Sequence, residues 1–264
     1  MNPRDLFEVS GKSAIVTGAT GALGKAASLA LAQMGAKLTL AAGTAFELEK
    51  VADEVRNLGS EVATIAMRPD SLENTDAIAQ KAADAFGGID ILIAASGTNL
   101  PNPIGEMPVE DWDSVMDANV RGSWLMCKSA GRHMLAQAQD NPARGGKVVL
   151  ISSVRGRHGS PFGYTSYCPS KAAIDGLTRS LALEWGSHGI NVNAIGPTVF
   201  RSKLTAWMFD EEKTGGNVPA LKRIPLGRLG EPEDLVGALL YLVSPASDFC
   251  TGQVIYVDGG YTAG

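Results

Sequence analysis

A tyrosine and a lysine four residues apart are the side chains in this sequence most suited to proton transfer. Tyr167 and Lys171 lie in the segment YCPSK, and residues at this spacing share one face of a helix. A phenol has a pKa of about 10, too high for a base at neutral pH. An ammonium about 4 Å away contributes roughly 4 kcal/mol at an effective dielectric near 20. We therefore expect Lys171 to lower the pKa of Tyr167 towards neutrality, with the helix N-terminus acting in the same direction.

Taken alone, this pair is also typical of a surface tyrosine beside a solvated lysine. A pair of hydroxyls upstream favours the catalytic interpretation, because Ser152 and Ser153 follow an apolar run and Ser153 precedes Tyr167 by fourteen residues. A serine at the end of a strand can donate to a carbonyl oxygen, which suits acid–base chemistry on an alcohol or a ketone. The sequence contains no G-x-S-x-G motif, so neither serine is a credible hydrolase nucleophile.

A glycine-rich turn near the N-terminus has the pattern of a phosphate-binding loop. The turn, 17–24, lies between an apolar run and an alanine-rich helical stretch. Glycines let the backbone approach a pyrophosphate, and the N–H groups at a helix start attract the anion. The residues expected to contact the nucleotide are Gly18, Thr20, Gly21, Leu23 and Gly24. A turn without a ligand is the alternative, whereas a nucleotide triphosphatase loop is excluded because Ala26 replaces the magnesium-binding hydroxyl.

The end of the second expected strand should discriminate between the two nicotinamide cofactors. Ala42, Gly43 and Thr44 stand about 20 residues after the turn, where NAD-binding sheets place a carboxylate for the ribose 2′-hydroxyl. This segment holds no carboxylate, and no arginine is available there for the 2′-phosphate of NADP. The missing carboxylate removes a repulsion against phosphate, and the Thr44 hydroxyl can donate to it. We therefore expect an NAD(P)(H) site with a slight preference for NADP.

Composition and charge exclude several other classes of protein. The chain has 264 residues, a net charge of −5 and no basic stripe, so we expect no nucleic-acid partner. No apolar run approaches the ~18 residues of a membrane span, and the N-terminus lacks the apolar core of a signal peptide. The three cysteines are widely spaced, which predicts neither a disulfide framework nor a metal site. We therefore expect a cytoplasmic protein that acts on a small molecule.

Apolar runs alternate with helical stretches along the whole chain. This alternation favours a parallel sheet with helices on both faces, because parallel strands need crossover connections. The expected strands are 13–17, 37–41, 61–66, 90–94, 147–152, 190–195 and 253–257. The expected helices are 22–34, 46–58, 74–86, 112–139, 169–185 and 232–243. No linker or repeat interrupts the series, so we expect one domain, 1–264, with a substrate lid around 197–230.

Several motifs, in this order, resemble those of the short-chain dehydrogenase/reductase family in its compact, single-domain branch. After the glycine-rich turn they are DILIAASG (90–97), Asn119, ISS (151–153), YCPSK (167–171), INVNAIGP (190–197) and TGQVIYVDGG (251–260). The resemblance covers nearly the whole chain. It implies a Rossmann-type, doubly wound α/β fold with a seven-stranded parallel sheet, NAD(P)-dependent chemistry between alcohols and ketones, and a homotetramer.

The resemblance also implies roles for individual residues. Tyr167 would be the general acid/base, Lys171 would lower its pKa and hold the nicotinamide ribose, and Ser153 would orient the substrate carbonyl. Asn119 would anchor the water of a proton relay. Ser152 is a weaker candidate for the serine role, because the interval from Ser153 to Tyr167 is one residue longer than usual in the family. Further cofactor contacts would come from Arg68, Pro69, Ala95, Ser96, Gly97, Pro197 and Val199.

The chain departs from the family pattern at three places. Ala22 replaces the second motif glycine, with Gly21 one residue earlier. AASG (94–97) replaces an Asn-Asn-Ala-Gly motif, so side-chain amides that brace the sheet are lost. Arg68 and Pro69 replace an aspartate and an apolar residue that normally meet the adenine. Arginine cannot accept from the adenine amine and proline has no N–H, so we expect an altered contact with Arg68 stacked on the ring.

These observations predict an NAD(P)(H)-dependent oxidoreductase that interconverts a secondary alcohol and a ketone. The stretch 197–209 is similar to sugar-, polyol- and gluconate-type members, which suggests a sugar, a polyol or a sugar acid as substrate. Arg155, Arg157 and His158 follow the serines and could meet an anionic or polyhydroxy substrate, although a solvated basic loop explains them equally well. The alternatives are a 3-oxoacyl-thioester reductase, which shares the catalytic residues, and a non-catalytic nucleotide-binding regulator.

Overall fold

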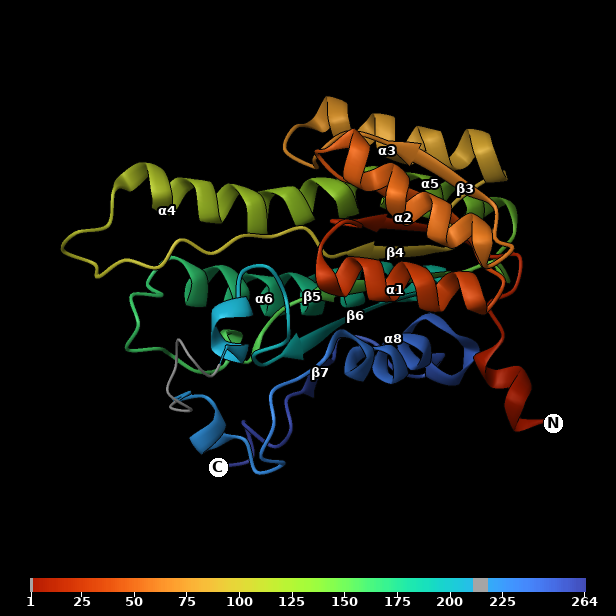
Figure 1. Cartoon of the computed structure of the whole chain (residues 1–264). Helices are drawn as coiled ribbons and strands as arrows, with labels where there is room; N and C mark the ends of the chain where they lie inside the picture. The colour runs from red at the N-terminus through yellow and green to blue at the C-terminus, as the bar shows by residue number, and fades with distance from the viewer. Residues whose placement is uncertain (1, 211–217) are drawn as a thin grey trace.

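The computed structural model contains a seven-stranded sheet with all strand pairs parallel, in the order β3-β2-β1-β4-β5-β6-β7 (Figure 1). The structure describes residues 2–210 and 218–264. The strands are β1 (Ser13–Thr17), β2 (Lys37–Ala41), β3 (Val62–Ile65), β4 (Ile91–Ala94), β5 (Gly146–Ile151), β6 (Ile190–Pro197) and β7 (Val254–Val257). The strand order turns back beside β1, which is the doubly wound arrangement that the alternating pattern predicts. The expected fold class is confirmed.

Helices cover both faces of this sheet. One layer contains α1 (Ala22–Gln33), α2 (Ala45–Asn57) and α8 (Val236–Val243). The other contains α3 (Leu72–Phe86), α5 (Gly122–Asp140) and α6 (Tyr167–Trp185). The central strand β1 alternates between the layers, since Ala14 and Val16 pack into the first core and Ile15 into the second. Burial on both faces explains why the strands are continuous apolar runs.

The long helix expected over 112–139 is interrupted in the structure. It begins earlier, as α4 (Val109–Met116), and passes through a π-helical turn, Asp117–Arg121, before continuing as α5 (Figure 1). The sequence periodicity does not reveal this turn, because it spans only five residues between two stretches that are each helical. Such turns are rare and often occur at functional sites. This one carries Asn119, whose side chain is buried.

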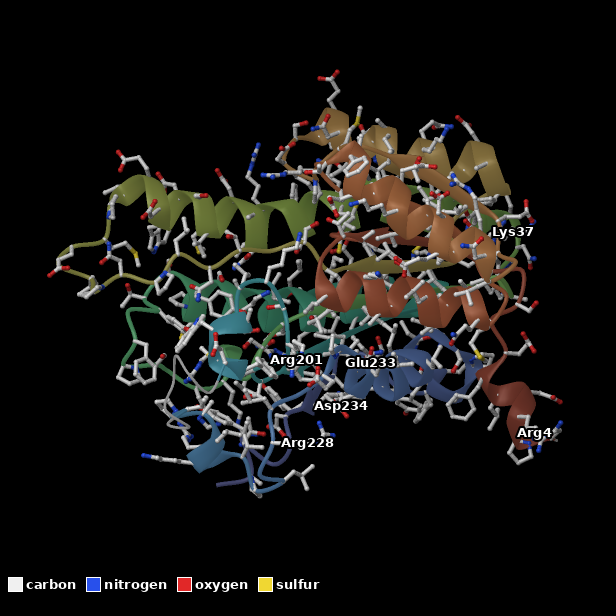
Figure 2. All side chains as sticks on the ribbon, in the orientation of Figure 1. Arg4, Lys37, Arg201, Arg228, Glu233 and Asp234 are labelled. Carbon is white, nitrogen blue, oxygen red and sulfur yellow. The ribbon has the colours of Figure 1, made fainter. Side chains whose placement is uncertain are left out.

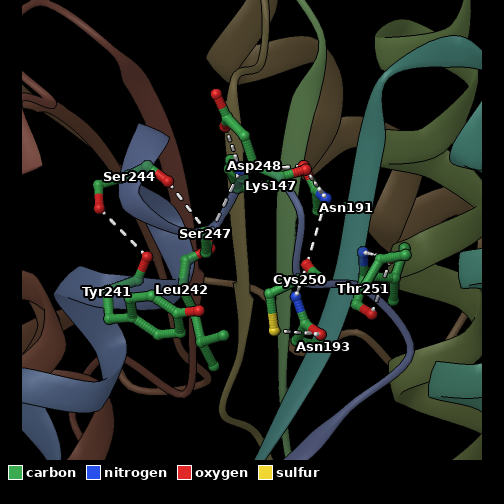
Figure 3. Close-up of polar contacts among 11 residues, drawn as sticks. Lys147, Asn191, Asn193, Tyr241, Leu242, Ser244, Ser247, Asp248, Cys250 and Thr251 are labelled. Atoms are coloured by element: carbon green, nitrogen blue, oxygen red, sulfur yellow. Dashed lines mark hydrogen bonds and ion pairs between the residues drawn. The ribbon is translucent and has the colours of Figure 1, made fainter. Parts of the chain in front are cut away.

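A polar cluster joins the amino end of the sheet to the segment that precedes β7 (Figure 3). Lys147, at the start of β5, donates to Asn191 Oδ1 at 2.9 Å and to Asp248 Oδ1 at 2.7 Å. Asn193 donates from Nδ2 to the carbonyl oxygen of Cys250 at 2.8 Å. These bonds set the register of β7 against β6 at the end of the sheet opposite to the expected site, so this end has a structural role.

The region expected to form a lid, 197–230, lies against the carboxyl end of the sheet, and residues 211–217 fall outside the described part. Two ion pairs hold its described flanks. Arg201 pairs with Glu231 at 2.9 Å, and Arg228 pairs with Asp234 at 2.6 Å (Figure 2). Its apolar side chains pack with residues from outside the segment, Val154, Tyr256 and Tyr261, in a small cluster. The members from the segment include Val199, Met208, Phe209, Val218, Leu221, Ile224 and Leu229. That the segment opens and closes over a substrate stays a prediction.

None of the helices within residues 2–210 and 218–264 combines the length and the apolar character that crossing a bilayer requires. The same residues bring together no group of three or more histidine, cysteine or acidic side chains that could hold a metal ion.

Candidate active site

The residues expected to form the site gather at the carboxyl edge of the sheet, where doubly wound folds bind their ligands. Residues 18–24 follow β1, 42–44 follow β2, 68–69 follow β3 and 95–97 follow β4. Ser153 follows β5, Pro197 ends β6 and Val199 lies just beyond it, while Tyr167 and Lys171 lie on α6. Asn119 approaches from the π-helical turn. Because the strands are parallel, segments far apart in the sequence share one edge.

The turn after β1 has the geometry of a pyrophosphate cradle. Gly18 has a φ of +65°, and a Cβ at this position would lie 2.7 Å from the carbonyl oxygen of Ala95. A Cβ at Gly24 would collide with the carbonyl oxygen of Gly18. Gly21 is the N-cap of α1 and makes no side-chain cap, so the first N–H groups of the helix stay open. These features fit the phosphates of a dinucleotide.

The remaining residues of the turn contribute in different ways. Ala22 is the first residue of α1, and its methyl group is accommodated there because Gly21 rather than Ala22 occupies the N-cap. Leu23 packs partly against the core, and Thr20 is partly buried at the bend before the helix. The backbone of Ser96 lies 2.8 Å from the place of a Gly18 Cβ. The structure therefore brings the loops after β1 and β4 into contact.

A buried hydroxyl without a hydrogen-bond partner lies beside the AASG segment, where the family has side-chain amides. Thr17, the last residue of β1, is paired in register with Ala94 of β4. The Thr17 hydroxyl is buried, and no hydrogen-bond partner for it exists among the described residues. An amide side chain on the neighbouring strand would be able to reach such a hydroxyl, whereas the alanine methyl cannot. That this departure removes a brace of the sheet stays a prediction.

An arginine lies at the end of β2, contrary to the expectation that none is available there. A Cβ at Gly43 would lie 2.5 Å from Nε of Arg68. The two residues are distant in the sequence, but β3 pairs directly with β2, so the residues that follow β3 return to the end of β2. Pro69 is buried and its carbonyl oxygen approaches Gly122 of α5. This backbone packing fixes the turn from which Arg68 extends.

Tyr167 and Lys171 face each other on the first turns of α6. The Lys171 ammonium lies 5.6 Å from the centre of the Tyr167 ring. The ammonium is buried and donates to the carbonyl oxygen of Ile151 at 2.8 Å. A Cβ at Gly97 would lie 3.7 Å from Lys171 Nζ, so the loop after β4 borders the same space. The spacing of these residues therefore places them on one helical face, as the sequence predicts.

The electrostatic expectation for this pair is wrong in the structure. Burial raises the pKa of Tyr167 to about 12, although the hydrogen bond with Ser153 and the nearby Arg155 act in the opposite direction. Burial also lowers the pKa of Lys171 to about 8, partly offset by Asp175. The ammonium lies beside the ring and bonds to a backbone carbonyl, so desolvation outweighs attraction between the two groups. Tyr167 is therefore a protonated phenol at neutral pH.

This order of pKa values predicts opposite pH profiles for the two directions of the reaction. Carbonyl reduction needs the protonated phenol, which is present throughout pH 6–9, so its kcat/KM should not rise with pH. Alcohol oxidation needs the ionised phenol, whose fraction grows about tenfold per pH unit below its pKa, so its kcat/KM should rise across this range. Steady-state kinetics in both directions measures the two profiles. An oxidation profile that is already level at pH 7 would instead indicate a phenol pKa near neutrality.

The two candidate serines point to different partners. The Ser153 hydroxyl hydrogen-bonds with Tyr167, accepts from the backbone N–H of Arg155 at 3.2 Å and lies 3.3 Å from the carbonyl oxygen of Pro197. The Ser152 hydroxyl donates to the carboxylate of Asp175 instead. Alternate residues of an extended chain face opposite ways, so only one of two adjacent serines can reach the tyrosine. The geometry therefore favours Ser153 as the residue that faces a substrate.

Asn119 is held by the protein on all sides. Its Oδ1 accepts from the backbone N–H of Thr98 at 2.7 Å. Its Nδ2 donates to the carbonyl oxygen of Thr98 at 3.0 Å and to the Ser170 hydroxyl at 2.9 Å. Both amide protons are thus used, and the side chain ties the loop after β4 to α6. The water-anchoring role of Asn119 stays a prediction.

Two further aromatic residues, which no sequence pattern singles out, lie beside Tyr167 or beside Arg155. Tyr164 meets the Tyr167 ring edge-on, with ring centres 5.8 Å apart. The Arg155 guanidinium lies 5.8 Å from the Tyr164 ring and 5.6 Å from the ring of Tyr261. Tyr261 directly follows the VDGG motif, which suggests only a turn from sequence alone. No local signal identifies it, because it reaches the site through the return of β7 to the sheet.

Comparison with known proteins agrees with this arrangement. Residues 18–262 match a family model described as enoyl-(acyl carrier protein) reductase. The chain is 53% identical over 260 residues to the uncharacterized oxidoreductase Rv1714 of Mycobacterium tuberculosis, covering 97% of this chain and 93% of that protein. It is 36% identical over 266 residues to gluconate 5-dehydrogenase of Gluconobacter oxydans, covering 99% of each.

A solved structure shows the same overall fold. The chain superposes with a TM-score of 0.89 and 28% identity on a gluconate 5-dehydrogenase from Burkholderia cenocepacia in complex with NADP and tartrate. The match covers 98% of each chain. The similarity therefore includes the whole sheet and both helical layers rather than the nucleotide-binding half alone.

Proposed function

The chain belongs to the short-chain dehydrogenase/reductase family and is an oxidoreductase that acts on hydroxyl groups. We propose that its substrate is a sugar acid, in which it interconverts a secondary alcohol and a ketone with NADP(H) as the cofactor. One observation carries this proposal: Ser153, Tyr167 and Lys171 meet at the carboxyl edge of the sheet, with the guanidinium of Arg155 beside them. This set supplies an acid, a hydroxyl that orients a carbonyl, and a positive charge for an anionic substrate.

The residues of the chain divide the chemistry between them. The turn 18–24 would hold the cofactor phosphates, and the bound cofactor supplies or accepts the hydride at the substrate carbon. In reduction, the Ser153 hydroxyl donates a hydrogen bond to the substrate oxygen, and Tyr167 transfers its phenolic proton to that oxygen. Lys171, with a pKa of about 8, can exchange protons near neutral pH and so restore the phenol. Oxidation runs through the same steps in reverse.

We propose the cofactor preference, the oligomeric state and the compartment from analogy with the family. The preference for NADP is supported by the absence of a carboxylate at Ala42–Thr44 and by the NADP in the Burkholderia enzyme. A homotetramer is proposed from the family, and Trp124 and Leu183 on the outer surfaces of α5 and α6 are exposed apolar side chains suited to a contact. The cysteines Cys127, Cys168 and Cys250 are unpaired, in keeping with a cytoplasmic, reducing compartment.

Arg155 is the main support for an acidic substrate. It is partly buried, its guanidinium donates to the carbonyl oxygen of Gly159 at 2.6 Å, and it makes no ion pair with a described carboxylate. A partly buried guanidinium without a carboxylate partner retains donors for an anion. The Arg155 guanidinium lies 5.8 Å from the ring of Tyr164, which itself packs edge-on against Tyr167, so a carboxylate bound to Arg155 would lie near the phenol.

We predict that Arg155→Met raises the KM for a sugar acid about 10- to 100-fold, because a charge-assisted hydrogen bond is lost. The KM for a neutral polyol should change much less. Arg157→Met makes the same change in net charge at an exposed neighbour and serves as the control, and Arg155→Lys should recover part of the affinity. Equal effects of Arg155→Met on acidic and neutral substrates would contradict the assignment.

A two-step assay tests the proposed function as a whole. First, tryptophan fluorescence titration with NADPH and NADH measures binding, and no binding of either would exclude the oxidoreductase. Second, turnover is measured on sugar acids that carry a ketone, on ketoses, on polyols and on 3-oxoacyl thioesters. A sugar acid as the best substrate supports the proposal, a 3-oxoacyl thioester as the best substrate supports the reductase alternative, and nucleotide binding without turnover supports the regulator.

A further inference from the structure

We propose that Arg68 binds the 2′-phosphate of NADP and makes this chain selective for NADP over NAD. The inference rests on the proposed nucleotide site and goes beyond it by assigning the selection to one residue outside the glycine-rich turn and outside β2. It also replaces the expectation that Arg68 stacks on the adenine.

The position of Arg68 carries the proposal. The end of β2 is the place where doubly wound sheets discriminate the 2′-hydroxyl from the 2′-phosphate, about 20 residues beyond the first turn. Arg68 lies over that end, because a Cβ at Gly43 would be 2.5 Å from its Nε and 3.0 Å from its Cγ. The part of the side chain from Cγ to Nε thus crosses the backbone at Gly43. Glycine at this position is what allows the approach.

The surroundings leave the guanidinium available. Arg68 is exposed, and neither a hydrogen bond nor an ion pair joins it to the described residues. Thr44 is the N-cap of α2 but makes no side-chain cap, so its hydroxyl is free to donate to the same anion. The carboxylates of Glu47 and Asp70, close in sequence to Thr44 and Arg68, are bonded to Lys50 and Asn74. Among the described residues, therefore, no acceptor engages the Arg68 guanidinium or the Thr44 hydroxyl.

The chemistry of the group selects a phosphate over a hydroxyl. A guanidinium presents several N–H donors in a plane and binds a phosphate dianion through two hydrogen bonds. A ribose hydroxyl offers no negative charge and gains little from the same donors. Stacking of Arg68 on adenine would stabilise NADP and NAD equally, since the two cofactors share the adenine. The ratio of the two affinities separates these arrangements.

Titration of the full chain with NADPH and NADH, followed by tryptophan fluorescence or calorimetry, tests the inference without catalysis. Arg68→Met should raise the dissociation constant for NADPH by about 10- to 100-fold and leave that for NADH nearly unchanged. Adenosine 2′,5′-bisphosphate and ADP, as minimal probes, should show the same difference. The discrimination of the unmodified chain should shrink as salt is added, because the contact is electrostatic.

A second variant removes the contact while keeping the arginine. Gly43→Ala places a Cβ 2.5 Å from Arg68 Nε, which is too close for a real contact, so the flexible side chain must move away. Gly43 does not have a positive φ, so the alanine is not strained and the fold should tolerate it. This variant should also weaken NADPH selectively. Arg56→Met, which makes the same change in charge as Arg68→Met at the far end of α2, should leave the ratio unchanged.

The outcomes distinguish this inference from the proposed function. Selective loss of NADPH binding in both variants supports it. Equal weakening of NADPH and NADH by Arg68→Met would indicate adenine stacking and overturn it, as would tight NADPH binding that Arg68→Met leaves intact. In the last two cases the proposed oxidoreductase function would be unaffected, because the chain would still bind a nucleotide. Failure of the unmodified chain to bind either cofactor overturns both.

Discussion

Tyr167→Phe should reduce kcat by about 10²- to 10⁴-fold, the range typical of a lost general acid–base. The substitution removes the proton that reduction delivers to the substrate oxygen and the base that oxidation requires. It leaves the ring in place beside Lys171, whose ammonium is 5.6 Å from the ring centre. The affinity for NADPH, measured by fluorescence titration, should therefore stay close to that of the unmodified chain.

Tyr164→Phe is the matched control for this experiment. It removes a phenolic hydroxyl from the neighbouring ring, which meets Tyr167 edge-on. Its effect on kcat should be far smaller, because Tyr164 makes no hydrogen bond with Ser153 and takes no part in the proposed transfer. Near-normal turnover of Tyr167→Phe would show that another group delivers the proton. A loss of turnover that is as large in Tyr164→Phe would point to disturbed packing instead.

The two serines should give opposite results when each is replaced by alanine. Ser153→Ala removes the hydroxyl that bonds with Tyr167 and that we expect to hold the substrate oxygen. A preorganised donor of this kind contributes about 10²–10³ in kcat. The change also removes the acceptor of the Arg155 N–H, so a modest fall in the melting temperature should accompany the large loss of kcat. Steady-state kinetics and thermal unfolding of the same preparations measure both quantities.

Ser152→Ala should instead destabilise the fold and spare the chemistry. The Ser152 hydroxyl donates to Asp175, whose side chain is buried and whose pKa is raised by that burial. A buried acceptor that loses its donor costs about 1–3 kcal/mol of folding free energy. Turnover per folded molecule should be retained. A loss of kcat as large as that of Ser153→Ala would identify Ser152 as the residue that binds the substrate.

Much of the fold and part of the site follow from local patterns. The apolar runs predict the strands of the sheet, and their alternation with helical stretches predicts parallel pairing, because buried parallel strands have few other solutions. The spacing of Tyr167 and Lys171 places them on one face of α6, since helical geometry depends on neighbours in the chain. The glycine-rich turn 17–24 can likewise be predicted, because the local backbone conformation requires its glycines.

The tertiary structure decided three matters that no local pattern contains. Arg68 reaches Gly43 because β3 pairs with β2, and strand order is a property of the whole sheet. Ser153 rather than Ser152 faces Tyr167 because the chain leaves β5 in one orientation only. The pKa of Tyr167 rises although a lysine lies beside it, because burial depends on everything that packs around the phenol. Sequence spacing reports which groups are neighbours along an element, whereas desolvation and cross-strand contacts depend on how the elements pack in three dimensions.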